Sequence, residues 1–379
     1  MGNKIYTKLD NISINNNINK KEDNYIENKN FFLKNPNLRF KRQILKSEEY
    51  NYRIFEYYYS IIGNNHNIAI GTKNYNINII AIENKDNIKL IKILEGHKSQ
   101  ITEIKYFKDI NNILHREYLL SAENKFLFIR DIIDNYNIIY KINLKYSKST
   151  EVISCLMLFN ISNSNYIISS SFQIIAKQNN MKDFTKIFLF NNKSVKHIRN
   201  VQNSNKYQTF YLLSWYNKND NNYYLIECCK EKMVINNLLT NYKYGELNSF
   251  FVEDKKVNFN YAFIYEEKGS DYIICSLSIG IISIWNLENK KLINIVNLKD
   301  CWPGVILRWN KIYIIVADKH QKSLKIISLD NLRLINNIIY KKKTINCEGY
   351  NYIIKVEYPK EGESILALSL EEIELWSAI

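Results

Sequence analysis

The sequence predicts an all-β fold: a closed ring of four-stranded antiparallel sheets, or β-propeller. One sequence pattern recurs along the chain. It predicts a buried strand, a tight turn, a second strand, a polar turn and a third strand. It is clearest in residues 272–298, and it returns at 118–132 and at 365–379. Because a single such sheet cannot bury both of its faces, the repeats are expected to stack and close into a ring.

The spacing of the repeat predicts the number of blades. The position that Trp285 fills in its repeat is matched along the chain by Ala81, Arg130, Phe190, Asn236, Ser328 and Trp376. A four-stranded blade takes about 40–45 residues, and longer spacings correspond to longer loops. These positions predict a seven-bladed ring, with six or eight blades as alternatives.

The predicted blades follow one another with short connections. They cover residues 50–93, 95–144, 150–201, 207–247, 249–298, 301–340 and 344–379. The spacing that leads into blade three, from Arg130 to Phe190, is the longest, and its excess lies in Ser171–Thr185. We expect this segment to be a loop between the second and third strands, either a binding insertion or a neutral expansion.

The two ends of the propeller are predicted to meet. The chain ends inside a third strand, Ile373–Ile379, so the last blade lacks an outer strand. Arg39–Leu45 alternates loosely and can supply that strand, which would remove an open sheet edge. Residues 1–38 are polar and rich in Asn, so the sequence predicts a disordered arm (1–38) followed by one propeller (39–379).

Individual motifs resemble the WD-repeat (WD40) family of β-propellers. The resemblance runs from about Phe40 to Ile379, and it depends on Gly96-His97, Ser121, Arg130-Asp131, Trp285-Asn286 and Trp376-Ser377. It implies a structural role for His97, Ser121, Trp285 and Trp376, because in the family a turn Asp, a His, a Ser or Thr and a Trp share hydrogen bonds. Here Glu123-Asn124 occupies the position of the turn Asp, and Arg130-Asp131 occupies the position where the family usually has Trp-Asp.

Composition limits the classes of partner and compartment. The formal net charge of +14 suits acidic protein segments, phosphates or RNA, although the abundance of Asn, Ile, Lys and Tyr also fits an AT-rich gene and dispersed surface lysines. The six cysteines form no CxxC pair, and most lie in apolar runs, which indicates core positions and a reducing compartment, cytoplasmic or nuclear. No apolar run is long enough for a membrane span.

The N-terminus leaves one membrane alternative open. Residues 1–7 begin like a myristoylation signal, but Tyr6 stands where Ser or Thr is expected and Thr7 comes one place late. A membrane partner is therefore expected only if Gly2 is acylated.

No catalytic motif appears in the chain. Phosphate-binding loops, dinucleotide fingerprints, zinc-protease motifs and nucleophile elbows are all missing from the sequence. We therefore predict no enzyme, no cofactor and no metal site. The aromatic segment Tyr50–Tyr59 alternates, so it is interpreted as a strand packed between blades rather than as a nucleic-acid stacking strip.

The predicted function is that of a non-catalytic protein-interaction scaffold, one subunit of a larger complex. A partner surface is expected on one rim, at Trp302, Lys319, Lys322, Lys341, Lys342 and Lys343. Trp302 suits a binding hot spot, although a role in filling a gap between blades is equally compatible. The alternatives are a propeller that binds RNA or ribonucleoprotein through its basic face, and a lipid-anchored adaptor.

Overall fold

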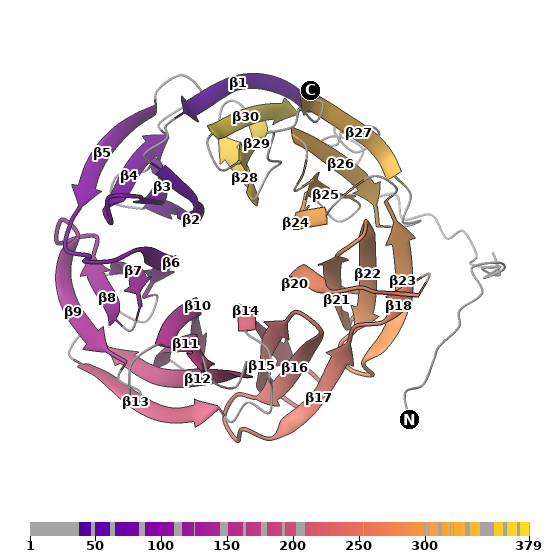
Figure 1. Ribbon diagram of the computed structural model, residues 1–379, viewed down its shortest axis with the longest axis horizontal. Coiled ribbons are helices and arrows are strands. Elements are labelled where there is room, and N and C mark those ends of the chain that lie inside the picture. Colours follow the sequence, from indigo (N-terminus) through magenta and orange to yellow (C-terminus); the bar gives the residue numbers. More distant parts are fainter. Residues whose placement is uncertain are drawn as a thin grey trace.

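The computed structural model describes residues 38–46, 50–60, 65–82, 88–109, 116–124, 126–144, 151–161, 164–175, 180–191, 194–201, 209–252, 254–298, 301, 303–309, 313–318, 320, 322–329, 334–341, 352–358, 362–369 and 372–378. No helix occurs among these residues, so none is available to span a membrane. The predicted arm (residues 1–38) lies outside the described residues except for Leu38. Figure 1 shows the strands arranged as radial sheets around an open centre.

Six four-stranded antiparallel sheets each use four strands that are consecutive in the sequence. Blade one contains β2 (Tyr50–Ser60), β3 (Asn65–Thr72), β4 (Ile77–Ile82) and β5 (Ile88–Leu94). Blade two contains β6 (Ile101–Lys108), β7 (Glu117–Glu123), β8 (Phe126–Asp131) and β9 (Asn137–Asn143). Blade three contains β10 (Glu151–Ile161), β11 (Ser164–Ile175), β12 (Asn180–Asn191) and β13 (Ser194–Val201).

The next three blades follow the same plan. Blade four contains β14 (Thr209–Asn217), β15 (Asn222–Cys229), β16 (Lys232–Asn237) and β17 (Lys243–Asn248). Blade five contains β20 (Phe259–Glu267), β21 (Ser270–Leu277), β22 (Ile281–Asn286) and β23 (Lys291–Asn297). Blade six contains β24 (Pro303–Arg308), β25 (Tyr313–Asp318), β26 (Lys322–Ser328) and β27 (Leu334–Lys341). A short hairpin of β18 (Phe251–Val252) and β19 (Lys255–Lys256) precedes blade five.

The remaining four-stranded sheet, blade seven, joins both ends of the chain. Its strands are β28 (Tyr352–Tyr358), β29 (Gly362–Leu368), β30 (Glu372–Ala378) and, outermost, β1 (Leu38–Lys46). In the antiparallel pairing of β1 with β30, Leu38 lies opposite Ala378 and Lys46 opposite Glu372. The predicted closure by Arg39–Leu45 is therefore confirmed, and Figure 1 shows β1 lying along β30 at the outside of the ring.

A β-bulge recurs between the third and outer strands of every blade. Each time, the outer strand contains one extra residue opposite the end of the third strand, and the third-strand residues at this step are Ile80, Arg130, Phe188, Asn236, Trp285, Ile327 and Trp376. Four of the predicted positions are confirmed. Ala81, Phe190 and Ser328 were placed one or two residues too late, because aliphatic runs without Trp offer no distinctive residue to align.

The predicted loop at Ser171–Thr185 is wrong. Strands β11 and β12 continue through this segment, with Ser171 opposite Phe184 and Ile175 opposite Asn180. Phe172, Ile174 and Ile175 favour strand geometry, so the ladder extends instead of ending. The extra length forms a long hairpin, of which only residues 176–179 at the tip lie outside the described residues.

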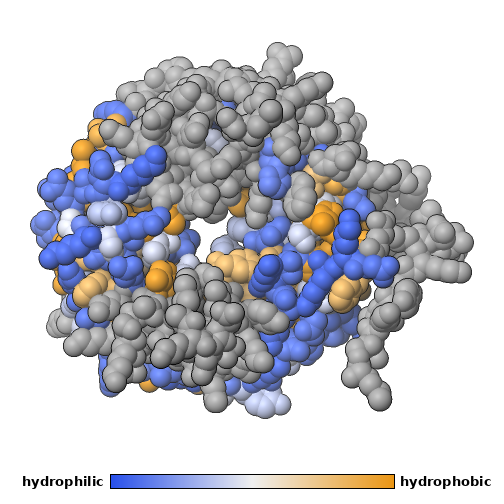
Figure 2. All heavy atoms as spheres, in the orientation of Figure 1, coloured by the Kyte–Doolittle hydropathy of each residue, from blue (hydrophilic) through white to orange (hydrophobic). Residues whose placement is uncertain are grey.

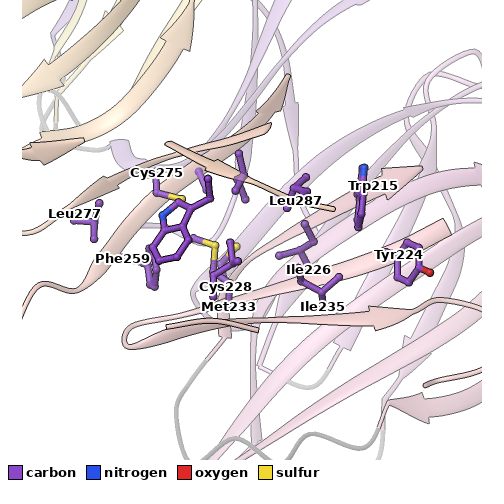
Figure 3. Close-up of a cluster of buried hydrophobic side chains, with 14 of the residues drawn as sticks. Trp215, Tyr224, Ile226, Cys228, Met233, Ile235, Phe259, Cys275, Leu277 and Leu287 are labelled. Carbon is purple, nitrogen blue, oxygen red and sulfur yellow. The ribbon is translucent and has the colours of Figure 1, made fainter. Parts of the chain in front are cut away.

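The core lies between neighbouring sheets rather than at a single centre. Between blades four and five, for example, Trp215, Ile226, Cys228, Phe259 and Cys275 are buried together (Figure 3). The cysteines in the described part of the chain are all buried and none of them forms a disulfide, as expected for core residues, whereas Cys347 lies outside it. Apolar burial of this kind is the main contribution to folding free energy.

The aromatic segment at the start of blade one is a strand, as predicted. It corresponds to β2, in which Tyr58 is buried and stacks on Tyr106 of blade two with ring centroids 4.8 Å apart. The Tyr58 hydroxyl also lies 2.9 Å from that of Tyr136. These contacts fix the aromatic rings between two blades.

Candidate functional site

A buried polar network lies where the connection after blade one meets blade two. His97 precedes β6, and Ser121 and Glu123 lie on β7. His97 Nε2 is 2.9 Å from Ser121 Oγ, and His97 Nδ1 is 3.5 Å from Glu123 Oε2. The same carboxylate oxygen accepts hydrogen bonds from the backbone N–H groups of Lys98 (2.6 Å) and Ser99 (2.9 Å). Glu123 therefore occupies the place that the family resemblance gives to a turn Asp.

The electrostatics of this network indicate a structural histidine. The pKa of His97 is lowered to about 4, chiefly by burial; the Glu123 carboxylate opposes the shift, and the cation of Arg130 adds to it. The His97 ring also packs against Phe128, with ring centroids 4.3 Å apart. A histidine that stays neutral at physiological pH, with both nitrogens facing protein groups, holds the turn in place.

The structure brings only two of the four predicted structural residues together, His97 and Ser121. Trp285 and Trp376 lie at equivalent steps of their own blades, both buried. The indole N–H of Trp285 donates to Ser283 Oγ at 3.0 Å. In blade two the equivalent Arg130 donates instead to the backbone carbonyls of Glu95 and Tyr136.

The inner strands surround a central cavity of about 490 Å³. Its lining comes from the first strands of blades one to six, from Phe55 on β2 to Val305 on β24. Figure 2 shows the opening at the middle of the ring. Side chains from residues far apart in the sequence thus face one space, an arrangement that no local sequence pattern reveals.

One wall of the cavity carries an ion-pair network. Lys105 Nζ lies 3.4 Å from Glu56 Oε2 and 3.3 Å from Glu103 Oε1. The backbone N–H of Tyr106 also donates to Glu56 at 3.2 Å. Burial raises the pKa of both carboxyl groups, and Lys105 opposes the rise. Within the described residues, no group of three or more His, Cys, Asp or Glu side chains is arranged to hold a metal ion.

The opposite wall of the cavity is aromatic and apolar. Phe210, Tyr211 and Tyr261 line it, and the Tyr211 hydroxyl donates to the Tyr261 hydroxyl at 3.4 Å. The cavity therefore combines a charged wall with an aromatic wall. Such surfaces suit recognition of a polar group with an apolar body.

Most of the predicted partner surface falls outside the described residues. Trp302, Lys319, Lys342 and Lys343 lie there, so their placement stays a prediction. Lys322 and Lys341 are paired in register on the neighbouring strands β26 and β27 of blade six. The structure thus brings these two positions together on one sheet.

The hairpin β18–β19 is a feature that the sequence reasoning missed. Lys255 and Lys256 are exposed on it, and Lys256 is paired with Glu231. Phe251 on the other strand is 63% exposed, while Phe250 beside it packs against Trp285. The signal available was a short polar turn, residues 253–254, between two segments of strand-forming character.

The fold and the site define a closed β-propeller, in which the inner strands of the blades line a central cavity. No family model matches the chain, and no curated protein matches it. Among solved structures, the chain is similar to BBS1N in a crystal structure of its complex with ARL6DN soaked with lead. That match has a TM-score of 0.62 and 10% identity, and it covers 88% of this chain and 94% of the other.

A second structure of the same complex, soaked with mercury, gives a consistent result. Its TM-score is also 0.62, with 8% identity over 91% of this chain and 98% of the other. At this level of identity the likeness establishes the propeller fold.

Proposed function

We propose that this protein is a non-catalytic, WD-type propeller scaffold that works as one subunit of a larger protein assembly. The observation that carries this proposal is the set of large apolar side chains that are exposed to solvent on strands and hairpins. Phe251 is 63% exposed and Ile293 54% exposed, although both belong to ordered strands. Apolar groups held exposed in this way are typical of protein contact sites.

The structural neighbours add support of a limited kind. BBS1N, a propeller of similar extent, is described in complex with a protein, ARL6DN. A propeller of this size can therefore present a surface that a folded protein recognises. The partner of the present chain is proposed to be a protein as well, met in the cytoplasm or nucleus.

The test is affinity purification with the full chain as bait, followed by calorimetry with the protein recovered. If the predicted rim is used, Trp302→Ala should weaken binding by about 2 kcal/mol, as expected for a hot-spot aromatic residue. Replacement of Lys341, Lys342 and Lys343 by Glu should mainly slow association and change its salt dependence. Normal binding by both variants, with cooperative melting retained, would place the partner on another surface.

Two alternatives predict different results in the same preparation. Binding to an RNA backbone should weaken steeply as ionic strength rises, and nucleic acid should dominate the recovered material. A lipid-anchored adaptor should show a myristoyl mass on Gly2 in mass spectrometry of the mature N-terminus.

A further inference from the structure

The outer strand of blade one is more apolar at its surface than the other outer strands whose side chains the structure describes. On β5, Leu90, Ile91 and Ile93 are 49%, 42% and 49% exposed. Among the other outer strands whose side chains the structure describes, β17 carries no large exposed apolar residue and β9, β13 and β23 carry one each: Ile138, Ile198 and Ile293. The excess on β5 therefore calls for an explanation specific to this blade.

The exposure follows from how β5 is anchored. Leu94 is buried in the core between blades one and two, and Lys92 Nζ donates to Asn135 Oδ1 of blade two at 2.6 Å. The bulge at Ile91 interrupts the alternation of side chains, so Leu90 and Ile93 share the face of the sheet opposite to that of Lys92 and Leu94. Figure 2 shows hydrophobic surface at the upper left periphery, where β5 lies in Figure 1.

The backbone of β5 can accept another strand. It is the last strand in its sheet and pairs with β4; within the described residues no strand pairs with its outer edge. An open edge presents a row of N–H and C=O groups that an extended peptide can pair with. The exposed isoleucines would then give that peptide apolar contacts in addition to backbone hydrogen bonds.

The charged residues of β5 indicate which kind of peptide can bind at its edge. The strand IKLIKIL contains two lysines, Lys89 and Lys92, and no acidic residue. Antiparallel pairing with a second copy of β5 would place four lysines in one short ribbon, and like charges across a strand pair are unfavourable. An acidic peptide avoids this repulsion and gains opposite-charge pairs.

We propose that the outer edge of β5 is a docking site for an extended segment of a partner protein with alternating apolar and acidic residues, which adds a further strand to blade one. The inference rests on the proposed scaffold role but names its own surface and ligand chemistry. A synthetic peptide can therefore test it even if the bait experiment recovers no partner.

The experiment uses the full chain and a fluorescein-labelled, capped heptapeptide, Glu-Val-Glu-Val-Asp-Val-Glu, followed by fluorescence anisotropy. Ile91→Glu and Ile93→Glu should each weaken binding about tenfold or more, because each replaces an apolar contact by a charge of the same sign as that of the peptide. The matched control is Ile198→Glu. Ile198 is the extra residue of the β13 bulge, as Ile91 is of the β5 bulge, and it is exposed to a similar degree.

Three further readouts decide the outcome. A peptide with Lys in place of every acidic residue should bind at least about tenfold more weakly. Hydrogen exchange should slow on β5 and not on β13 when the acidic peptide is added, and sedimentation should show that the chain stays monomeric. The proposal is overturned if Ile91→Glu and Ile198→Glu behave alike, if both peptides bind equally, or if β5 is occupied by a second copy.

Discussion

At the scale of single residues, Glu123 shows how a longer side chain takes over a structural position. Its carboxylate accepts two backbone N–H groups of the turn after His97 and also approaches the imidazole. The carboxylate and His97 are both nearly fully buried, so the network holds together two strands and a connection. Buried hydrogen bonds such as those that the Glu123 carboxylate accepts fix a unique local geometry.

The pH dependence of stability should report this network. His97 has a pKa near 4 in the folded protein and an ordinary value of 6.5 when exposed, so the unfolded chain binds more protons between these values. The contribution of neutral His97 to the free energy of unfolding should therefore be fully present above pH 6.5. It should fall by about 2 kcal/mol as the pH drops toward 4.5. Urea titrations of the wild type and of His97→Asn at several pH values would measure this slope.

The control is His197→Gln, because His197 is exposed on an outer strand. His197→Gln should keep the wild-type slope over this pH range, whereas His97→Asn should flatten it, although acidic groups common to all variants still contribute. An identical slope in His97→Asn would mean that the titration of His97 is not linked to folding.

Alanine substitutions at two glycines should distinguish the stability cost of backbone strain from that of a steric clash. Gly269 and Gly280 both have left-handed backbone angles (φ +81° and +80°). A Cβ at Gly269 would meet nothing within 4 Å, whereas one at Gly280 would lie 2.5 Å from the carbonyl oxygen of Leu298. Gly269→Ala should cost about 1 kcal/mol of stability and Gly280→Ala several times more. Equal melting temperatures for the two variants would contradict this expectation.

At the scale of elements, local sequence pattern predicts strands well and their ends poorly. The repeated sequence pattern predicts the strand order within each blade and the positions of Trp285 and Trp376. The extension of β11 and β12 was missed, because the additional pairs form only once the two strands are already in register. The hairpin β18–β19 was missed because each of its strands has only two residues.

The candidate sites were less predictable than the fold. The cavity lining comes from strands separated by most of the chain, so Glu56 and Glu103 meet Lys105 only when neighbouring blades pack. The contact between His97 and Ser121 was accessible because both residues belong to a motif with fixed spacing. The apolar edge of β5 had a visible signal, a strand without strict alternation, but its exposure depends on its position at the periphery.

At the scale of the whole molecule, the ring is closed by hydrogen bonds between the two ends of the chain. Removing residues 1–30 should leave stability unchanged, because β1 begins at Leu38. Removing residues 1–46 should expose the edge of β30 and cause aggregation and a lower melting temperature. Light scattering during a thermal melt compares the two truncations directly, and equal behaviour would argue against a stabilising role for β1.

The pairing of β1 with β30 also sets an order of events during synthesis. β1 is made before the other strands of the ring and its partner β30 after them, so β1 must wait without its sheet until those strands have left the ribosome. Contacts between such distant segments are slow to form, since a long loop must close before they are made. Closure of the ring is thus a late step of folding, and until it occurs both β1 and the edge of β30 are exposed to chaperones and to neighbouring chains.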